Sequence, residues 1–189
     1  PPPDPEVEYP QHASAAKSWG DTLTDEERDA LATYTQPVGS ADPMLVANAS
    51  RKGELPETTT LYRAIAEPAS TWKGVANLKP GDTYRMDGSE WSTATSLDKD
   101  TAQQMWGGHG DDSGIVMEIE APAGTKAGFP SIYFDRDPNE FPASEQEVLL
   151  PPETTFEVVD VSEPLDREAG GPLKTITLRV VDQPEVMPS

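Results

Sequence analysis

The chain of 189 residues has no cysteine and only two histidines, His12 and His109. The absence of cysteine excludes disulfide bonds, thiolate zinc sites and cysteine nucleophiles. With two histidines far apart in the sequence, a metal centre and a histidine-based catalytic triad both lack their usual side chains. We therefore expect no metal, and we interpret each histidine as an ordinary surface residue.

Basic residues are also scarce: 14 Lys and Arg stand against 34 Asp and Glu, which gives a formal net charge of −20. Such a chain repels nucleic acid phosphates and anionic membranes, because electrostatic binding to either requires clustered Lys and Arg. Nucleic acid binding is therefore not expected. An anionic ligand such as a dinucleotide would need a local cationic anchor, which makes any isolated arginine a candidate.

Long apolar runs are missing as well. The sequence has no stretch near the roughly 20 apolar residues of a membrane-spanning helix. It also has no basic start followed by an apolar stretch, the pattern of a signal peptide. We expect a soluble protein without a membrane span. With 35% hydrophobic and 25% charged residues, the chain has the composition and length of one globular domain.

Both ends of the chain are rich in proline and resemble linker from a longer protein. Residues 1–17 are also acidic, and we expect an arm or linker with little fold there, because they offer little apolar surface to bury. Residues 18–182 are predicted to form the domain, and residues 183–189 a C-terminal tail. A targeting segment beyond these ends would not be seen in this sequence, so the compartment stays open.

Two helices are predicted before the first strand. Thr24, followed three residues later by Glu27, forms a capping-box pattern that starts a helix over residues 25–35. A second helix is predicted over residues 42–53, with Pro43 at its first position. Proline is favoured there because the first turn of a helix does not need its missing N–H group.

The rest of the chain is dominated by strand signals. β-Branched and aromatic residues recur between prolines and glycines, interrupted by one predicted helix over residues 98–106. Helices first and then mainly strands favour an α+β architecture over a doubly wound parallel sheet. The predicted strands cover residues 58–65, 90–95, 114–119, 147–150, 155–161 and 174–181.

Arg63 lies in the middle of the first predicted strand, on the same face as Leu61 and Ile65. A charge among apolar neighbours is costly unless a partner meets it. Two interpretations stand: a structural arginine that pairs with a carboxylate or reaches the sheet edge, and an anion clamp. A guanidinium suits the second role, because its planar fork donates two parallel hydrogen bonds to a phosphate.

A row of hydroxyl side chains follows over residues 92–96. Ser92, Ala94 and Ser96 alternate on one face of an extended chain, and two threonines occupy the other. Such a row is typical of an exposed strand, because threonine favours β structure. It also suits a binding site, where the hydroxyls would orient a carboxylate or a ligand without reacting.

Glu145 and Glu147 mark the entry to the apolar strand predicted over residues 147–150. If the chain is extended there, their spacing places both carboxylates on the same side. The same pattern occurs at residues 6–8 and 118–120, so in this acidic chain the pattern alone does not identify a functional site. The context distinguishes the third pair, because a loop precedes it and an apolar run follows.

In this order, the three motifs resemble the catalytic core of the arginine-directed, toxin-like mono-ADP-ribosyltransferases. That family has an Arg on an early strand, a Ser/Thr-rich strand and a Glu-x-Glu at a later strand. The resemblance covers roughly residues 20–182. It implies the ADP-ribosyltransferase-like fold, in which N-terminal helices are followed by a two-sheet, mainly antiparallel β core.

The resemblance also implies an activity: ADP-ribose passes from NAD, the co-substrate, to an arginine of a target protein, and nicotinamide is released. Proteins of this kind are toxins or effectors, and the acidic composition would suit a bacterial or phage genome. The resemblance therefore implies a protein that is secreted, injected or phage-delivered.

Four residues would contact NAD by this resemblance. Arg63 would bind an NAD phosphate, and the backbone of Ala64, where the family often has Gly, would contact the nicotinamide amide. Ser92 would shape the nicotinamide pocket and hold the catalytic glutamate. Trp106 is a candidate to stack on nicotinamide, and its alternative role is that of a helix core residue.

The two glutamates would share the chemistry. Glu147 would hydrogen-bond the ribose next to nicotinamide and stabilise the positive charge that develops there as the glycosidic bond breaks. Glu145 would face the acceptor arginine, orient it and accept its proton.

The hydroxyl motif departs from the family pattern. The usual Ser-Thr-Ser is stretched here over residues 92–96. Counted from Trp91, the key hydroxyl is Ser92, whereas counted from Leu97 the position is Ala94. Besides the transferase, two other functions stay open: an NAD glycohydrolase, in which water intercepts the cation, and a catalytically inactive scaffold or binding module of a larger protein.

Overall fold

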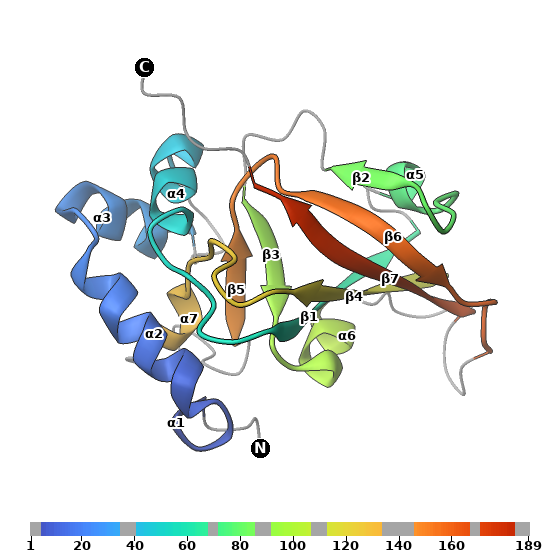
Figure 1. Cartoon of the computed structure of the whole chain (residues 1–189), viewed down its shortest axis with the longest axis horizontal. Coiled ribbons are helices and arrows are strands. Elements are labelled where there is room, and N and C mark those ends of the chain that lie inside the picture. Colours follow the sequence, from blue (N-terminus) through green and yellow to red (C-terminus); the bar gives the residue numbers. More distant parts are fainter. Residues whose placement is uncertain are drawn as a thin grey trace.

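A computed structural model describes residues 5–34, 41–67, 72–85, 92–106, 113–133, 146–166 and 171–183. Within these ranges the strands form one seven-stranded sheet, and α1 to α4 lie together beside its β3 and β5 end (Figure 1). No helix among the described residues has the length and hydrophobicity needed to cross a membrane.

The helices are α1 (Pro5–Glu8), α2 (Pro10–Asp21), α3 (Asp25–Tyr34), α4 (Pro43–Ser50), α5 (Trp72–Val75), α6 (Lys99–Trp106) and α7 (Pro130–Tyr133). The strands are β1 (Thr59–Ala66), β2 (Thr83–Arg85), β3 (Thr93–Ser96), β4 (Gly114–Ala121), β5 (Glu147–Leu150), β6 (Thr155–Val161) and β7 (Leu173–Asp182).

The strand order is β2-β6-β7-β4-β1-β3-β5. β4 and β7 run parallel, and the other neighbouring strands are antiparallel. The predicted α+β class with N-terminal helices and mainly antiparallel strands is confirmed. The predicted division into two sheets is wrong, because β1 pairs with β4 along its whole length and also with β3, through Tyr62 and Ser96. That single pairing lets β3 and β5 turn steeply away from β6 and β7 within one sheet (Figure 1).

The N-terminal segment is more ordered than its composition suggests. The expectation of little fold in residues 1–17 is wrong for residues 5–17, which form α1 and most of α2. Ala13, Ala16 and Trp19 are buried at helical spacing on one face of α2. The prolines and acidic residues suggested a solvated arm, but this narrow apolar face is sufficient to dock the helix on the domain.

His12 lies on the buried side of α2, with only 3% of its surface exposed, so its interpretation as a surface residue is wrong. Its Nε2 is 2.8 Å from Oγ1 of Thr59, at the start of β1, and the Tyr9 ring meets the imidazole edge-on. Burial lowers the pKa of His12 from its ordinary value of 6.5, an effect that the charge of Glu57 partly opposes.

We expect His12 to make the protein less stable in mild acid. Because the folded state favours the neutral imidazole, the unfolded state binds the proton first as the pH falls. The stabilising contribution is complete well above pH 6.5 and declines as the pH drops through that value toward the lower pKa of the folded protein. Urea unfolding at a series of pH values checks this. In the control, His12→Gln, the free energy of unfolding should depend less steeply on pH between about pH 7 and about pH 5. Equal pH dependence in the two proteins would contradict the prediction.

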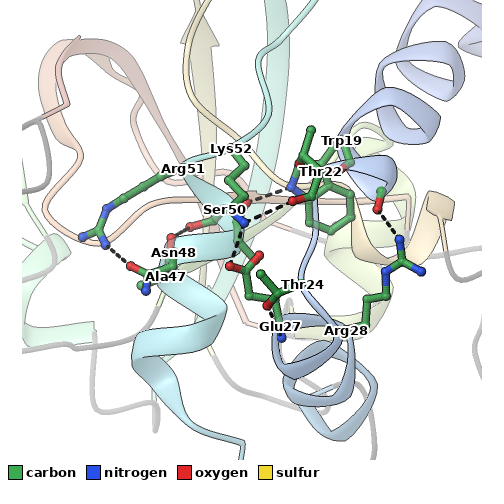
Figure 2. Close-up of polar contacts among 12 residues, drawn as sticks. Trp19, Thr22, Thr24, Glu27, Arg28, Ala47, Asn48, Ser50, Arg51 and Lys52 are labelled. Atoms are coloured by element: carbon green, nitrogen blue, oxygen red, sulfur yellow. Dashed lines mark hydrogen bonds and ion pairs between the residues drawn. The ribbon is translucent and has the colours of Figure 1, made fainter.

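The ends of α2, α3 and α4 meet at one lysine. Lys52 Nζ lies 2.8 Å from Oε1 of the buried Glu27 and donates to the carbonyl of Thr22 at 3.1 Å (Figure 2). One half of the predicted capping box is present, since the Thr24 hydroxyl accepts a hydrogen bond from the Glu27 amide at 3.1 Å, whereas the Glu27 carboxylate pairs with Lys52. These bonds fix the position of α3, whose last residue, Tyr34, reaches the candidate site.

Trp19 is the centre of the packing between these helices and the sheet. Its side chain is 2% exposed, and its indole Nε1 donates to the carbonyl of Ala49 at 2.8 Å. The backbone approaches the ring closely at Gly53 and Gly128, where an added Cβ would lie 2.9 Å from indole carbons. Glycine at these two positions therefore makes room for the largest side chain of the core.

The predicted strands agree with the structure where the hydrophobic pattern is strongest. β5 and β6 have the predicted bounds, and β1, β4 and β7 begin or end within two residues of them. The short elements α5, β2 and α7 were missed. A segment of three or four residues is too short to show a helical or strand period.

Candidate functional site

Glu147 is the first residue of β5 and is 4% exposed. Its backbone N–H donates to the hydroxyl of Ser131 at 2.6 Å, and its Oε1 accepts a hydrogen bond from the Tyr34 hydroxyl at 3.2 Å. On the neighbouring strand its Cα partner is Ser96. The carboxylate is thus bound by Tyr34 of α3, the backbone of the same residue is bound by Ser131 of α7, and the residue is largely removed from water.

Gln146, immediately before this glutamate, has a φ of 42° and is fully buried. This left-handed conformation is uncommon for a residue other than glycine. The spacing of Glu145 and Glu147 would place both side chains on one side only if the chain between them were extended, and Gln146 does not have an extended conformation. β5 begins at Glu147. Glu145 itself lies outside the described residues.

Arg63 lies at the centre of β1 and points its guanidinium toward β3. Nη1 donates to the carbonyl of Ala94 at 2.8 Å, whereas the buried Nε has no hydrogen-bond partner among the described residues. In the same part of the chain no carboxylate lies within ion-pair distance of Arg63. Burial lowers the pKa of Arg63, and the nearby side chains of Tyr84, Tyr34 and Glu147 partly oppose that shift.

These contacts distinguish between the two interpretations of Arg63. Within the described residues Arg63 forms no ion pair, and its buried Nε donates to no described group. A partly buried guanidinium with spare donors is costly unless an anion completes its bonding. The geometry therefore favours an anion clamp.

The register of β3 decides which hydroxyls lie near the glutamate. Ser92, the predicted site residue, lies just before β3. Its Oγ is 3.0 Å from Oγ of Ser50 at the end of α4, and this hydrogen bond connects the start of β3 to that helix. Ser96 lies directly opposite Glu147, on the same face of the strand pair. Thr95 points its hydroxyl to the carbonyl of Val148 at 2.7 Å.

β3 therefore joins the two charged residues of the site. Its Ala94 carbonyl binds Arg63, and its Ser96, two residues later, is the cross-strand partner of Glu147. Arg63 and Glu147 are thus both connected to β3, Arg63 through the backbone of Ala94 and Glu147 through its pairing with Ser96.

The remaining predicted site residues are Ala64 and Trp106. Ala64 is buried in β1 opposite Val116 of β4. Trp106 is the last residue of α6, and its side chain lies outside the described part of the chain. Tyr34 was not predicted as a site residue, because from the sequence it is one of the apolar positions of its helix. Only the fold shows that its hydroxyl reaches Glu147.

The described ranges contain no group of three or more His, Cys, Asp or Glu side chains placed to hold a metal ion.

No family model matches the chain, and no curated protein sequence matches it. Several solved structures, in contrast, are similar to this chain. Plx2a, an ADP-ribosyltransferase toxin from Paenibacillus larvae, matches with a TM-score of 0.62 at 18% identity, over 89% of this chain and 92% of that one. C3stau2 from S. aureus, solved with NAD, matches with a TM-score of 0.57 at 18% identity, over 90% of this chain and 95% of that one.

The enzymatic component C2-I of the C2-toxin from Clostridium botulinum is also similar, with a TM-score of 0.63 at 15% identity. The match covers 92% of this chain and 47% of that one, so this chain spans about half of C2-I. At identities of this order the likeness establishes the fold. The chain has the α+β fold of the bacterial ADP-ribosyltransferase toxins.

Proposed function

We propose that this protein is an NAD-dependent mono-ADP-ribosyltransferase that moves ADP-ribose to an arginine side chain of a target protein and releases nicotinamide. One observation carries the proposal: a buried carboxylate, Glu147, stands opposite Ser96 on the strand whose Ala94 carbonyl binds Arg63, in the fold of the ADP-ribosyltransferase toxins. A dinucleotide needs a cation and the reaction needs a fixed negative charge, and this arrangement supplies both.

Arg63 would bind the pyrophosphate of NAD. In this acidic protein, an anionic ligand must be attracted locally against the overall field. The buried Nε, which donates to no group in the described ranges, fits a phosphate group. The solved structure of C3stau2 contains NAD, which supports the same ligand here.

Glu147 would stabilise the transition state of glycosidic bond cleavage. As the bond between ribose and nicotinamide breaks, its electron pair leaves with nicotinamide and positive charge develops on the ribose. A fixed carboxylate in a buried site stabilises that charge more than it stabilises the bound substrate, which is the condition for a faster chemical step. The Tyr34 hydroxyl donates to the Glu147 carboxylate and the Glu147 backbone N–H donates to the Ser131 hydroxyl, and both bonds hold Glu147 in place before the charge develops.

Glu145 would receive the acceptor arginine. An arginine guanidinium is cationic and a poor nucleophile, so a carboxylate must orient it and accept its proton as the new bond to the ribose forms. The target would be a host protein, since the similar structures are toxins, and we extend to this chain the role of a bacterial or phage toxin or effector.

The experiment compares transfer from labelled NAD to agmatine, an arginine mimic, by the wild type and by Glu145→Gln. We expect the wild type to label agmatine and Glu145→Gln to release nicotinamide without labelling it, because water then replaces the acceptor. A wild type that only hydrolyses NAD would indicate a glycohydrolase. A wild type that neither labels agmatine nor consumes NAD would indicate an inactive scaffold and would overturn the proposal.

A further inference from the structure

β5, the strand that carries Glu147, is the last strand of the sheet, and its outer edge is partly covered by the segment that leads into α7. Gly128 and Leu149 exchange two backbone hydrogen bonds of 2.9 Å as an isolated antiparallel bridge. This bridge fixes the register of the two segments only two residues from Glu147.

The bridge also explains why a side chain must bind the Glu147 amide. In an antiparallel register through Gly128 and Leu149, the residue opposite Glu147 would be Pro130. The chain turns into α7 at Pro130, so the ladder cannot continue with a backbone acceptor. The hydroxyl of Ser131, which is 4% exposed, takes that place and accepts the Glu147 N–H at 2.6 Å.

The backbone next to this bond is in an unfavourable conformation. Gln146 keeps a positive φ although it is neither glycine nor exposed. Such conformations persist where the surroundings hold them. The Ser131 bond acts on the peptide that joins Gln146 to Glu147, so it holds the carboxylate-bearing residue against relaxation of the residue before it.

α7 itself is held by the N-terminal helices. Tyr133, its last residue, packs edge-on against Trp19 with ring centroids 6.0 Å apart. It also occupies the space beside Gly20, where a Cβ would lie 2.0 Å from the ring. Phe129, just before α7, is fully buried and meets Trp19 in the same way. Ser131 is therefore presented from a fixed element.

We propose that Ser131 is a positioning residue for Glu147: its hydroxyl fixes the backbone from which the catalytic carboxylate projects. This inference rests on the proposed function of Glu147. A displaced carboxylate would still allow NAD to bind through Arg63, so the effect belongs to kcat and not to the affinity for NAD. Misplacement of a reacting group by about 1 Å costs roughly 100-fold in rate.

The test compares Ser131→Ala with Thr154→Ala. Thr154 is also buried, and its hydroxyl donates to the carbonyl of Pro151 at 2.7 Å, beyond the far end of β5. Three quantities are measured for each protein: kcat and KM for nicotinamide release from NAD, the thermal midpoint of unfolding, and hydrogen exchange at the Glu147 amide by NMR. Ser131→Thr, which restores the hydroxyl, is the rescue variant. Ser131→Cys, with a weaker acceptor of similar size, serves if Ser131→Ala does not fold.

We expect Ser131→Ala to lower kcat by about 10- to 100-fold with KM changed by less than about threefold. Exchange at the Glu147 amide should become at least about tenfold faster, and Ser131→Thr should recover most of kcat. Thr154→Ala should keep the wild-type kcat. If kcat in Ser131→Ala equals that in Thr154→Ala, or if Glu147 exchange is unchanged, the inference is overturned. If exchange accelerates but the wild type does not consume NAD, the proposed function fails while the Ser131 bond stands.

Discussion

Glu147→Gln is expected to lower kcat for NAD consumption by about 100- to 1000-fold, the usual cost of removing one fixed group that stabilises transition-state charge. Glutamine has the size of glutamate, and its amide oxygen can still accept the hydrogen bond from Tyr34. The substitution therefore removes the negative charge and leaves the packing of this 4% exposed side chain in place. Nicotinamide release under saturating NAD is the measurement.

The affinity for NAD should change little in this variant, because under the proposed function the charge of Glu147 would act on the ribose as the bond breaks and Arg63 would still bind the phosphates. Glu157→Gln is the matched control. It removes one carboxylate that pairs with Arg179 on the surface of β6 and β7, away from the site. A Glu147→Gln protein whose kcat stays within about threefold of the control would remove Glu147 from the chemistry.

Trp19→Ala is expected to destabilise the protein by about 3–5 kcal/mol, the range for truncating a large aromatic side chain in a core. The side chain is 2% exposed and packs edge-on against Phe129 and Tyr133. Its loss also leaves the Ala49 carbonyl without the indole donor. Since a domain is stable by only about 5–15 kcal/mol, the free energy of unfolding from urea titration should fall by a large part of its total.

Trp72→Ala is the matched control for this substitution, because Trp72 on α5 is only partly buried at the other end of the sheet (Figure 1). We expect a clearly smaller loss of unfolding free energy there. If Trp19→Ala does not fold, Trp19→Phe keeps a ring in the core and removes the indole donor together with part of the ring volume. Equal losses for Trp19→Ala and Trp72→Ala would show that the α2 docking contributes less than its burial suggests.

The same tryptophan connects stability to the site. α7 packs against α2 through Tyr133 and supports Glu147 through Ser131. A loosened α2 is therefore expected to reduce activity before the whole domain unfolds.

The strand bounds were predictable where the side chains repeat their pattern over several residues. β6 has the predicted bounds because apolar residues recur along it. β5 has the predicted bounds because its short, mainly apolar run lies between turn signals. The cap of α3 was predictable for a local reason, since Thr24 and the amide of Glu27 are neighbours on one helical turn.

The two helices that precede α3, namely α1 and α2, were not predictable in the same way. In sequence, the prolines and acidic residues before Trp19 outnumber the apolar ones. The helix is stabilised by what it covers, and the residues that it covers, Phe129 and Tyr133, come more than a hundred positions later. Tertiary burial outweighed local composition here.

By itself the sequence determined which reactive groups the protein contains. It has no thiol, its cationic residues are so few that Arg63 stands out, and a glutamate begins an apolar strand. These follow from residue identity and local pattern. Only the tertiary structure decided which groups meet. The pairing of β3 with β5 sets Ser96, and not Ser92, opposite Glu147. The folding of α3 onto the sheet brings Tyr34 to the same carboxylate across 113 residues. Register and docking depend on burial summed over the whole molecule, and no local pattern encodes that sum.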